Sequence, residues 1–194
     1  MNQLKECGKK HFDFLNQFGY SILEADTADK VSFIGKNNQI DVMFSAIGYE
    51  LTCQFVDNDN NTFSLQDGLL YESIEEFKGL YQMASKEEFE KGVAYLAKAV
   101  KLIFQRIDVS DSLNFQKIYQ FSVETRKKSL EKYYLEADLK KAEEYLANKE
   151  YDKAKELLEK NIEKLSKSQL KKLEYIRKAE QGTVLKMNNG SDAI

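Results

Sequence analysis

Residues 40–55, IDVMFSAIGYELTCQF, decide the fold that we expect for this chain. Apolar and polar side chains alternate along this stretch, as they do in strands that bury one face. From Phe89 to Ile107, by contrast, apolar residues recur at steps of three and four, which is the period of an amphipathic helix. The change of period near residue 85 predicts an α+β fold. It consists of an N-terminal helix, a small antiparallel sheet of three or four strands, and an α-helical C-terminal half.

An amphipathic helix is expected at the start of the chain. Its apolar face carries Leu4, Cys7, His11, Phe14, Leu15 and Phe18. Gly19 follows at a position where a C-terminal cap is favoured. Because His11, the only histidine in the sequence, lies on this face, we expect it to be packed and hydrogen-bonded rather than to act as a ligand or base.

Strand-like alternation follows in four segments. Their apolar residues are Val31 and Phe33; Ile40, Val42, Phe44 and Ala46; Tyr49, Leu51, Cys53 and Phe55; and Phe63 with Leu65. An even-length loop around Ile47 and Gly48 would bring the two middle strands into one register. That register pairs Phe44 with Leu51, Val42 with Cys53, and Ile40 with Phe55. The opposite face is then expected to be polar and in contact with water, and it carries Asp41, Met43, Ser45, Glu50, Thr52 and Gln54.

The run DNDNN at residues 57–61 has the composition of a calcium loop. An EF-hand loop would require glycine at Thr62 and a bidentate glutamate at Gly68, and neither is present. Asn and Asp also favour turns, so the run predicts a hairpin loop and no metal site.

The phrases FDFLNQFGY (12–20), VSFIG (31–35), IDVMF (40–44), YELTCQF (49–55) and TFSLQDGLL (62–70) follow one another along the chain. Within residues 10–70 this succession resembles a set of small bacterial α+β proteins of unknown function. Some of them look like immunity proteins encoded beside polymorphic toxins. The resemblance implies a helix followed by an antiparallel meander, and it carries over no functional residue.

Helical patterns dominate after residue 85. Ser85 and Glu88 have the spacing of a capping box, which predicts an amphipathic helix over residues 86–107 and a first module over residues 1–110. Residues 108–125 form the junction to the next part of the chain, and their composition leaves helix and strand equally open.

A helical hairpin or three-helix extension is expected over residues 111–181, with a turn near 148–150 and a flexible tail over 182–194. In residues 145–160, YLANKEYDKAKELLEK, four positions match a tetratricopeptide repeat: Tyr145, Tyr151, Ala154 and Leu158. The segment therefore resembles part of such a repeat. Asp138 and Lys141 stand where that repeat has large apolar residues, so a plain helical hairpin is the alternative.

Charge and composition limit the possible functions. Residues 1–85 carry a net charge of −7 and residues 86–194 a net charge of +4, so a basic partner is expected on the acidic side. Cys7 and Cys53 lack CxxC spacing, which favours two reduced thiols. We expect a cytoplasmic protein without a membrane span, because no long uncharged apolar stretch is present.

The sequence contains no G-x-S-x-G, Gly-rich phosphate loop or H-E-x-x-H motif, so we expect no enzyme, no catalytic residue and no cofactor. A protein-binding module is the function that we expect, in the form of an immunity-type inhibitor of a basic toxin. Its expected partner-binding residues are Asp41, Glu50, Gln54, Asp57 and Asp59. The alternative is a nucleic-acid-associated accessory protein that uses the Lys-rich C-terminal helices, although residues 126–181 contain 16 basic and 12 acidic residues. The oligomeric state is left open.

Overall fold

The computed structural model describes residues 3–23, 27, 29–83 and 85–188. The chain divides into two compact units, residues 1–125 (unit 1) and residues 126–194 (unit 2). Helix α4 (Ser112–Ala147) contributes its first part to unit 1 and the remainder to unit 2. Residues 112–125, which the sequence left open between helix and strand, are therefore helical and belong to the first unit.

Unit 1 is built on a six-stranded antiparallel sheet. Its strands are β1 (Ser21–Ile22), β2 (Lys30–Ile34), β3 (Asn38–Ser45), β4 (Glu50–Asp57), β5 (Thr62–Ser64) and β6 (Leu80–Gln82). They follow the order β1-β2-β3-β4-β5, and β6 pairs with β4 beside β5. The α+β architecture is confirmed. The predicted count of three or four strands was too low, because β1 and β6 are too short to show alternation.

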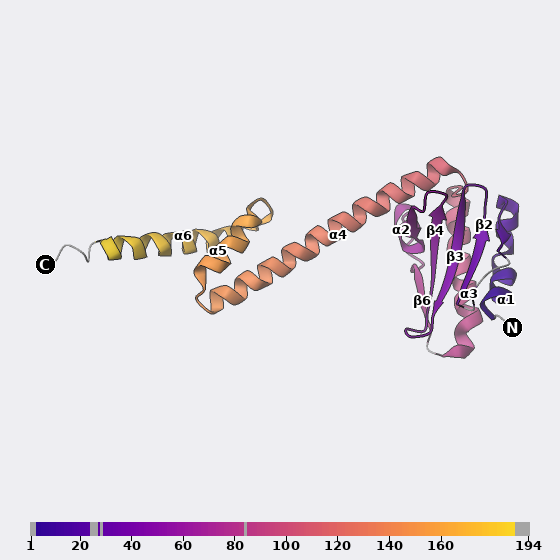
Figure 1. Ribbon diagram of the computed structural model, residues 1–194, viewed down its shortest axis with the longest axis horizontal. Coiled ribbons are helices and arrows are strands. Elements are labelled where there is room, and N and C mark those ends of the chain that lie inside the picture. Colours follow the sequence, from indigo (N-terminus) through magenta and orange to yellow (C-terminus); the bar gives the residue numbers. More distant parts are fainter. Residues whose placement is uncertain (1–2, 24–26, 28, 84, 189–194) are drawn as a thin grey trace. The chain divides into compact units, whose positions relative to one another are not determined.

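The register of the two central strands is the one expected from their alternation. Phe44 pairs with Leu51, Val42 with Cys53, and Ile40 with Phe55. Helices α1 (Gln3–His11) and α3 (Phe89–Arg106) pack on the apolar face of this sheet (Figure 1). The predicted stripe of α3 is buried there from Phe89 to Ile103.

Close packing explains one glycine of α3. A Cβ atom at Gly92 would lie 2.7 Å from Cδ1 of Leu51 and 2.8 Å from Cδ1 of Tyr81. A larger residue at this position would therefore require the Leu51 and Tyr81 side chains to move.

Several helix ends differ from the prediction. The first helix ends at His11 and continues as a 3₁₀ turn (Asp13–Phe18), which Gly19 caps with a φ of 79°. Helix α3 begins at Phe89 rather than residue 86, after a 3₁₀ turn (Lys86–Glu88), and its N-cap residue Glu88 makes no side-chain cap hydrogen bond. The Ser85–Glu88 capping box was thus wrong as the start of this helix.

A capping box does occur at helix α2 (Leu65–Tyr71), where Ser64 and Asp67 exchange hydrogen bonds between side chain and backbone. The sequence places Leu65 in a strand with Phe63, whereas in the structure the strand ends at Ser64 and Leu65 begins the helix. Leu65 and Leu69 have the i,i+4 spacing of a helix, but one such pair is too little to establish a period. The Ser-x-x-Asp spacing was therefore the signal that identifies this helix.

Unit 2 is helical. It comprises the second part of α4, helix α5 (Tyr151–Lys160), a 3₁₀ turn (Ile162–Lys164) and helix α6 (Lys167–Asn188). Its small core consists of Ala142, Ala154, Leu158, Leu173 and Ile176. Helix α6 passes the predicted end near residue 180, and residues 189–194 of the predicted flexible tail lie outside the described residues.

The turn between α4 and α5 lies where the hairpin was expected. The Glu150 N–H donates to the Tyr145 carbonyl and the Lys149 N–H to the Leu146 carbonyl, which is the Schellman arrangement. Lys149 holds the left-handed position with a φ of 61°, where glycine is usual.

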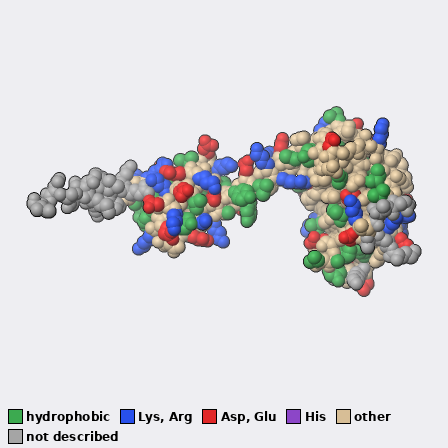
Figure 2. All heavy atoms as spheres, in the orientation of Figure 1, with side chains coloured by type: hydrophobic (Ala, Val, Ile, Leu, Met, Phe, Trp, Pro, Cys, Tyr) green, Lys and Arg blue, Asp and Glu red, His purple; other side chains and the backbone are tan. Residues whose placement is uncertain are grey.

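In the middle of α4, hydrophobic side chains are visible at the surface (Figure 2).

Candidate functional site

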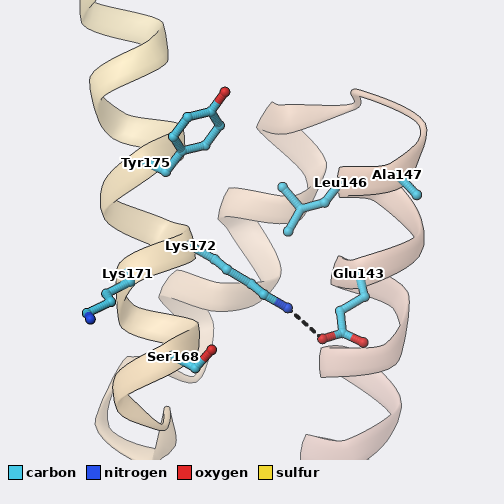
Figure 3. A pocket seen from close by; sticks show the side chains of 7 residues that line it. All are labelled: Glu143, Leu146, Ala147, Ser168, Lys171, Lys172 and Tyr175. Atoms are coloured by element: carbon cyan, nitrogen blue, oxygen red, sulfur yellow. Dashed lines mark hydrogen bonds and ion pairs between the residues drawn. The ribbon is translucent and has the colours of Figure 1, made fainter.

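A groove lies between α4 and α6 in unit 2, and α5 forms its back (Figure 3). It has a volume of about 730 Å³. Its lining residues come from the last turns of α4 and the first turns of α6, namely Glu143, Leu146, Ala147, Ser168, Lys171, Lys172 and Tyr175. The three helices are held together by the small core beneath, so the groove is a product of how α6 packs back on the hairpin.

The groove combines apolar and cationic side chains. Leu146 and Tyr175 provide apolar surface, and 64% of Tyr175 is exposed to solvent. Lys172 reaches across from α6 and its Nζ lies 2.8 Å from an Oε atom of Glu143 on α4 (Figure 3). The hydrogen bond and the charge of Lys172 lower the pKa of Glu143.

One cation of the groove is in excess. Within the described part of the chain Lys171 forms no ion pair, whereas Lys172 is paired with Glu143. The lining therefore carries one net positive charge, together with the hydroxyl groups of Ser168 and Tyr175. Such a surface can accept a carboxylate beside an apolar side chain.

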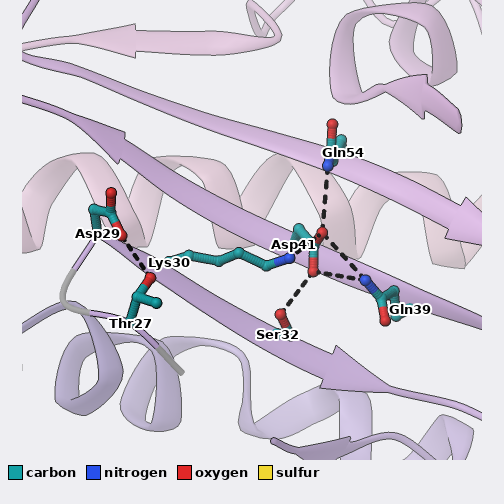
Figure 4. A network of polar contacts seen from close by, with 7 residues as sticks. All are labelled: Thr27, Asp29, Lys30, Ser32, Gln39, Asp41 and Gln54. Carbon is teal, nitrogen blue, oxygen red and sulfur yellow. Dashed lines mark hydrogen bonds and ion pairs between the residues drawn. The ribbon is translucent and has the colours of Figure 1, made fainter. Parts of the chain in front are cut away.

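Asp41, the central residue of the predicted acidic site, is buried (Figure 4). Only 1% of it is exposed, and Nζ of Lys30 lies 2.8 Å from its Oδ2. Its carboxylate also accepts hydrogen bonds from the Ser32 hydroxyl at 2.7 Å and from the side-chain amides of Gln39 and Gln54. The expectation that Asp41 faces water was wrong, because side chains of the neighbouring strands cover it and use its hydrogen-bonding capacity.

Asp57 is likewise engaged within the protein. One carboxylate oxygen accepts hydrogen bonds from the backbone N–H groups of Asp59 and Asn61. The other accepts from the side chains of Asn61 and Gln116, at 2.9 Å and 2.8 Å. The predicted hairpin loop is confirmed, and the Gln116 bond fastens it to α4.

Glu50 and Asp59 do not join these residues in one surface. Glu50 begins β4 and Asp57 ends it, so the two are about 23 Å apart along an extended strand. Asp59 is exposed in the loop beyond. The five predicted partner-binding residues are thus spread over the length of the sheet, with Asp41, Gln54 and Asp57 in internal hydrogen bonds.

Six basic side chains of unit 2 are paired with nearby carboxylates. Ion pairs join Lys132 to Glu136, Lys153 to Glu150, Lys160 to Asp138, Lys164 to Glu131, Lys172 to Glu143, and Arg177 to Glu159. This pairing weakens the field on which a sequence-independent nucleic-acid surface depends.

Other candidate chemistry has a structural explanation. His11 is half-buried, and its Nε2 lies 3.2 Å from Oε1 of Glu90 on α3. Among the described residues, no group of three or more His, Cys, Asp or Glu side chains is placed to hold a metal ion. In the same part of the chain, no helix has the length and apolar character needed to cross a membrane.

Sequence reasoning missed the groove, because its two walls are separated in sequence and meet only through the fold of unit 2. The signal that could have indicated it is the match of residues 145–160 to part of a tetratricopeptide repeat, since helices of such repeats stack to form concave surfaces.

In comparisons with known proteins, no protein family, characterised protein or solved structure matches the chain.

Proposed function

We propose that this chain is a non-catalytic protein-binding protein, and that the groove between α4 and α6 receives a segment of its partner. The observation that supports the proposal is the lining of the groove, in which exposed Tyr175 and half-buried Leu146 lie beside Lys172, with Lys171 at the rim (Figure 3). Aromatic and apolar side chains next to a few oriented polar groups are typical of binding sites. The matching segment carries an apolar side chain beside a carboxylate.

The ion pair between Lys172 and Glu143 can be replaced by a pair between Lys172 and a carboxylate of the partner. Lys172 and Glu143 are both well exposed, so their pairing contributes little to stability. A carboxylate of the partner can take the place of Glu143 on Lys172 at small cost, and the positive charge of Lys171 at the rim adds to the attraction. Groove binding is therefore expected to weaken as the salt concentration rises.

The test uses two synthetic peptides and the full chain labelled with ¹⁵N. The acidic peptide, EESFELSEE, carries Phe and Leu among glutamates, and the matched basic peptide has lysine in place of each glutamate. On titration with the acidic peptide, amide shifts are expected in residues 143–147 and 168–175. The basic peptide is expected to leave these amides unchanged. Equal shifts with both peptides, or shifts confined to unit 1, would contradict the proposal.

A second candidate function is inhibition of a basic toxin by unit 1, which the resemblance of residues 10–70 implies. It is supported by the net charge of residues 1–125, which is −7, against +4 for residues 126–194. The test is capture of the chain from its native host followed by cross-linking and mass spectrometry. A basic toxin cross-linked to residues 1–125 supports this function. A partner cross-linked only to unit 2 would contradict it.

A further inference from the structure

The middle of helix α4 carries a group of large apolar side chains at the surface, which we call the tyrosine patch: Leu130, Tyr133 and Tyr134. Their exposed fractions are 55%, 66% and 62%. Every residue from 126 to 134 is exposed. Glu131 forms an ion pair with Lys164 at 3.3 Å, whereas the three apolar side chains are open to solvent. A helix segment that is exposed on all sides is expected to be polar all round. The patch is therefore not explained by the fold.

The three side chains form one surface. Leu130 stands one helical turn before both tyrosines, at the i,i+3 and i,i+4 positions. The rings of Tyr133 and Tyr134 meet edge to face, with centroids 5.7 Å apart and planes at 71°. The two rings alone present roughly 250 Å² of surface, given that a tyrosine buries on the order of 200 Å². This area approaches that of the largest apolar patch on a typical monomer, about 300–600 Å², which is often functional.

Cations flank this surface in a regular way. Arg126 and Lys127 precede Tyr133 and Tyr134 by seven residues each, and Lys140 and Lys141 follow them by seven. Seven residues are two turns of a helix, so each tyrosine has a cation on its own face at both ends.

A shallow cleft of about 500 Å³ continues the surface beyond Tyr133. It is lined by Tyr133, Glu136, Ala137, Lys140, Lys141 and Glu144. Glu136 pairs with Lys132 at 3.8 Å, and Lys141 lies 5.8 Å from the Tyr145 ring centroid. Glu136 and Glu144 thus add two negative charges to the cleft. They do not change the positions of the cations, which still lie two turns before and two turns after the tyrosines.

We infer that the tyrosine patch docks an amphipathic helix of another protein, one with an apolar stripe in its middle and acidic residues two turns to either side. Charge complementarity selects this occupant. Two copies of the patch, paired in register, would place cations on cations in either direction: Arg126 on itself when parallel, and Arg126 and Lys127 on Lys140 and Lys141 when antiparallel. A second copy is thus disfavoured. The inference is independent of the groove.

The test is a selection from displayed helical peptides. The full chain is the target, and the library varies one face of an alanine-based helix of about 22 residues. Enriched helices are expected to carry an apolar centre and Asp or Glu toward both ends. They should bind the Tyr133→Ala/Tyr134→Ala variant at least tenfold more weakly than the wild type. Because both residues are exposed, this variant keeps the wild-type far-UV circular dichroism spectrum. Leu113→Ala, at a 64% exposed position near the start of α4 and outside both the groove and the patch, is the matched control and should leave helix binding unchanged.

Four outcomes would overturn the inference. The first is that the enriched helices carry Lys or Arg toward their ends, and the second is that they bind the double variant as tightly as the wild type. The third is a dimer of the chain in sedimentation velocity that the double variant loses. The fourth is binding of the chain, through the patch, to vesicles of phosphatidylcholine and phosphatidylserine. The last two results would assign the patch to a second copy or to an anionic membrane. Failure of the groove peptides would leave the helix result standing, because the two tests probe different side chains.

Discussion

Replacement of Asp41 by alanine is expected to destabilise the sheet of unit 1 strongly. The carboxylate is 1% exposed, and Ser32, which donates to it at 2.7 Å, is also 1% exposed. Removing an acceptor from a buried hydroxyl costs about 1–3 kcal/mol, and removing one member of a buried ion pair costs about 3–5 kcal/mol. Lys30 is 38% exposed and can turn toward water, which reduces the second contribution. We therefore expect a loss of about 2–4 kcal/mol in the free energy of unfolding.

Thiol exchange at Cys53 measures this loss within unit 1. Cys53 lies on β4 with 1% exposure, and burial raises the pKa of its thiol, so it reacts only when the sheet opens. In a Cys7→Ser background, Asp41→Ala should accelerate labelling of Cys53 by roughly 30- to 1,000-fold, given that 1.4 kcal/mol is a factor of ten. Ser45→Ala, at the exposed end of β3, is the matched control and should change the rate less than about threefold. If Asp41→Ala changed the labelling rate as little as Ser45→Ala does, the carboxylate would have no role in stabilising the sheet. Asp41 would then again be a candidate for binding a partner.

Three further substitutions test local features. Lys149→Gly should stabilise unit 2 by about 0.5–1 kcal/mol, seen as a higher melting temperature, because glycine adopts the positive φ of this position without strain; a lower melting temperature would contradict this. Ser122→Ala should stabilise the protein by about 0.5–1 kcal/mol in urea denaturation, since the Ser122 hydroxyl is buried and forms no hydrogen bond within the described chain; a destabilised variant would indicate a partner for the hydroxyl. The Lys10 and His11 side chains lower the pKa of Glu90, so its contribution to stability is present above the unfolded pKa of about 4.3 and is lost as the pH falls through the folded value. The stability difference between wild type and Glu90→Gln should therefore shrink between about pH 5 and pH 3, and a difference that grows on acidification would contradict the sign.

The strand register could be predicted because it depends on local pattern. Alternation and an even loop length suffice to pair Phe44 with Leu51 and to place both on the buried face. The burial of Asp41 could not be predicted in this way. The pattern shows that the residue lies on the polar face, but its coverage depends on Lys30 and Ser32 from the adjacent strand.

The extent of α4 and the groove were missed for different reasons. The β-branched and aromatic residues of KIYQFSVET (117–125) match strand composition, but Phe115 and Ile118 are buried as part of a helix by packing in unit 1. The groove depends on the return of α6 toward α4, which brings Lys172 to Glu143 across 29 positions of sequence. No local pattern contains that information.

The central claim, that the groove binds an acidic segment, is tested most directly by reversing its charge. The affinity of the acidic and basic peptides is measured for the wild type and for the Lys171→Glu/Lys172→Glu variant, with Lys167→Glu, outside the groove lining, as the matched control. The account predicts that the double variant loses the acidic peptide at least tenfold and gains the basic one, while the control behaves as the wild type. Unchanged binding of the acidic peptide by the double variant would contradict it.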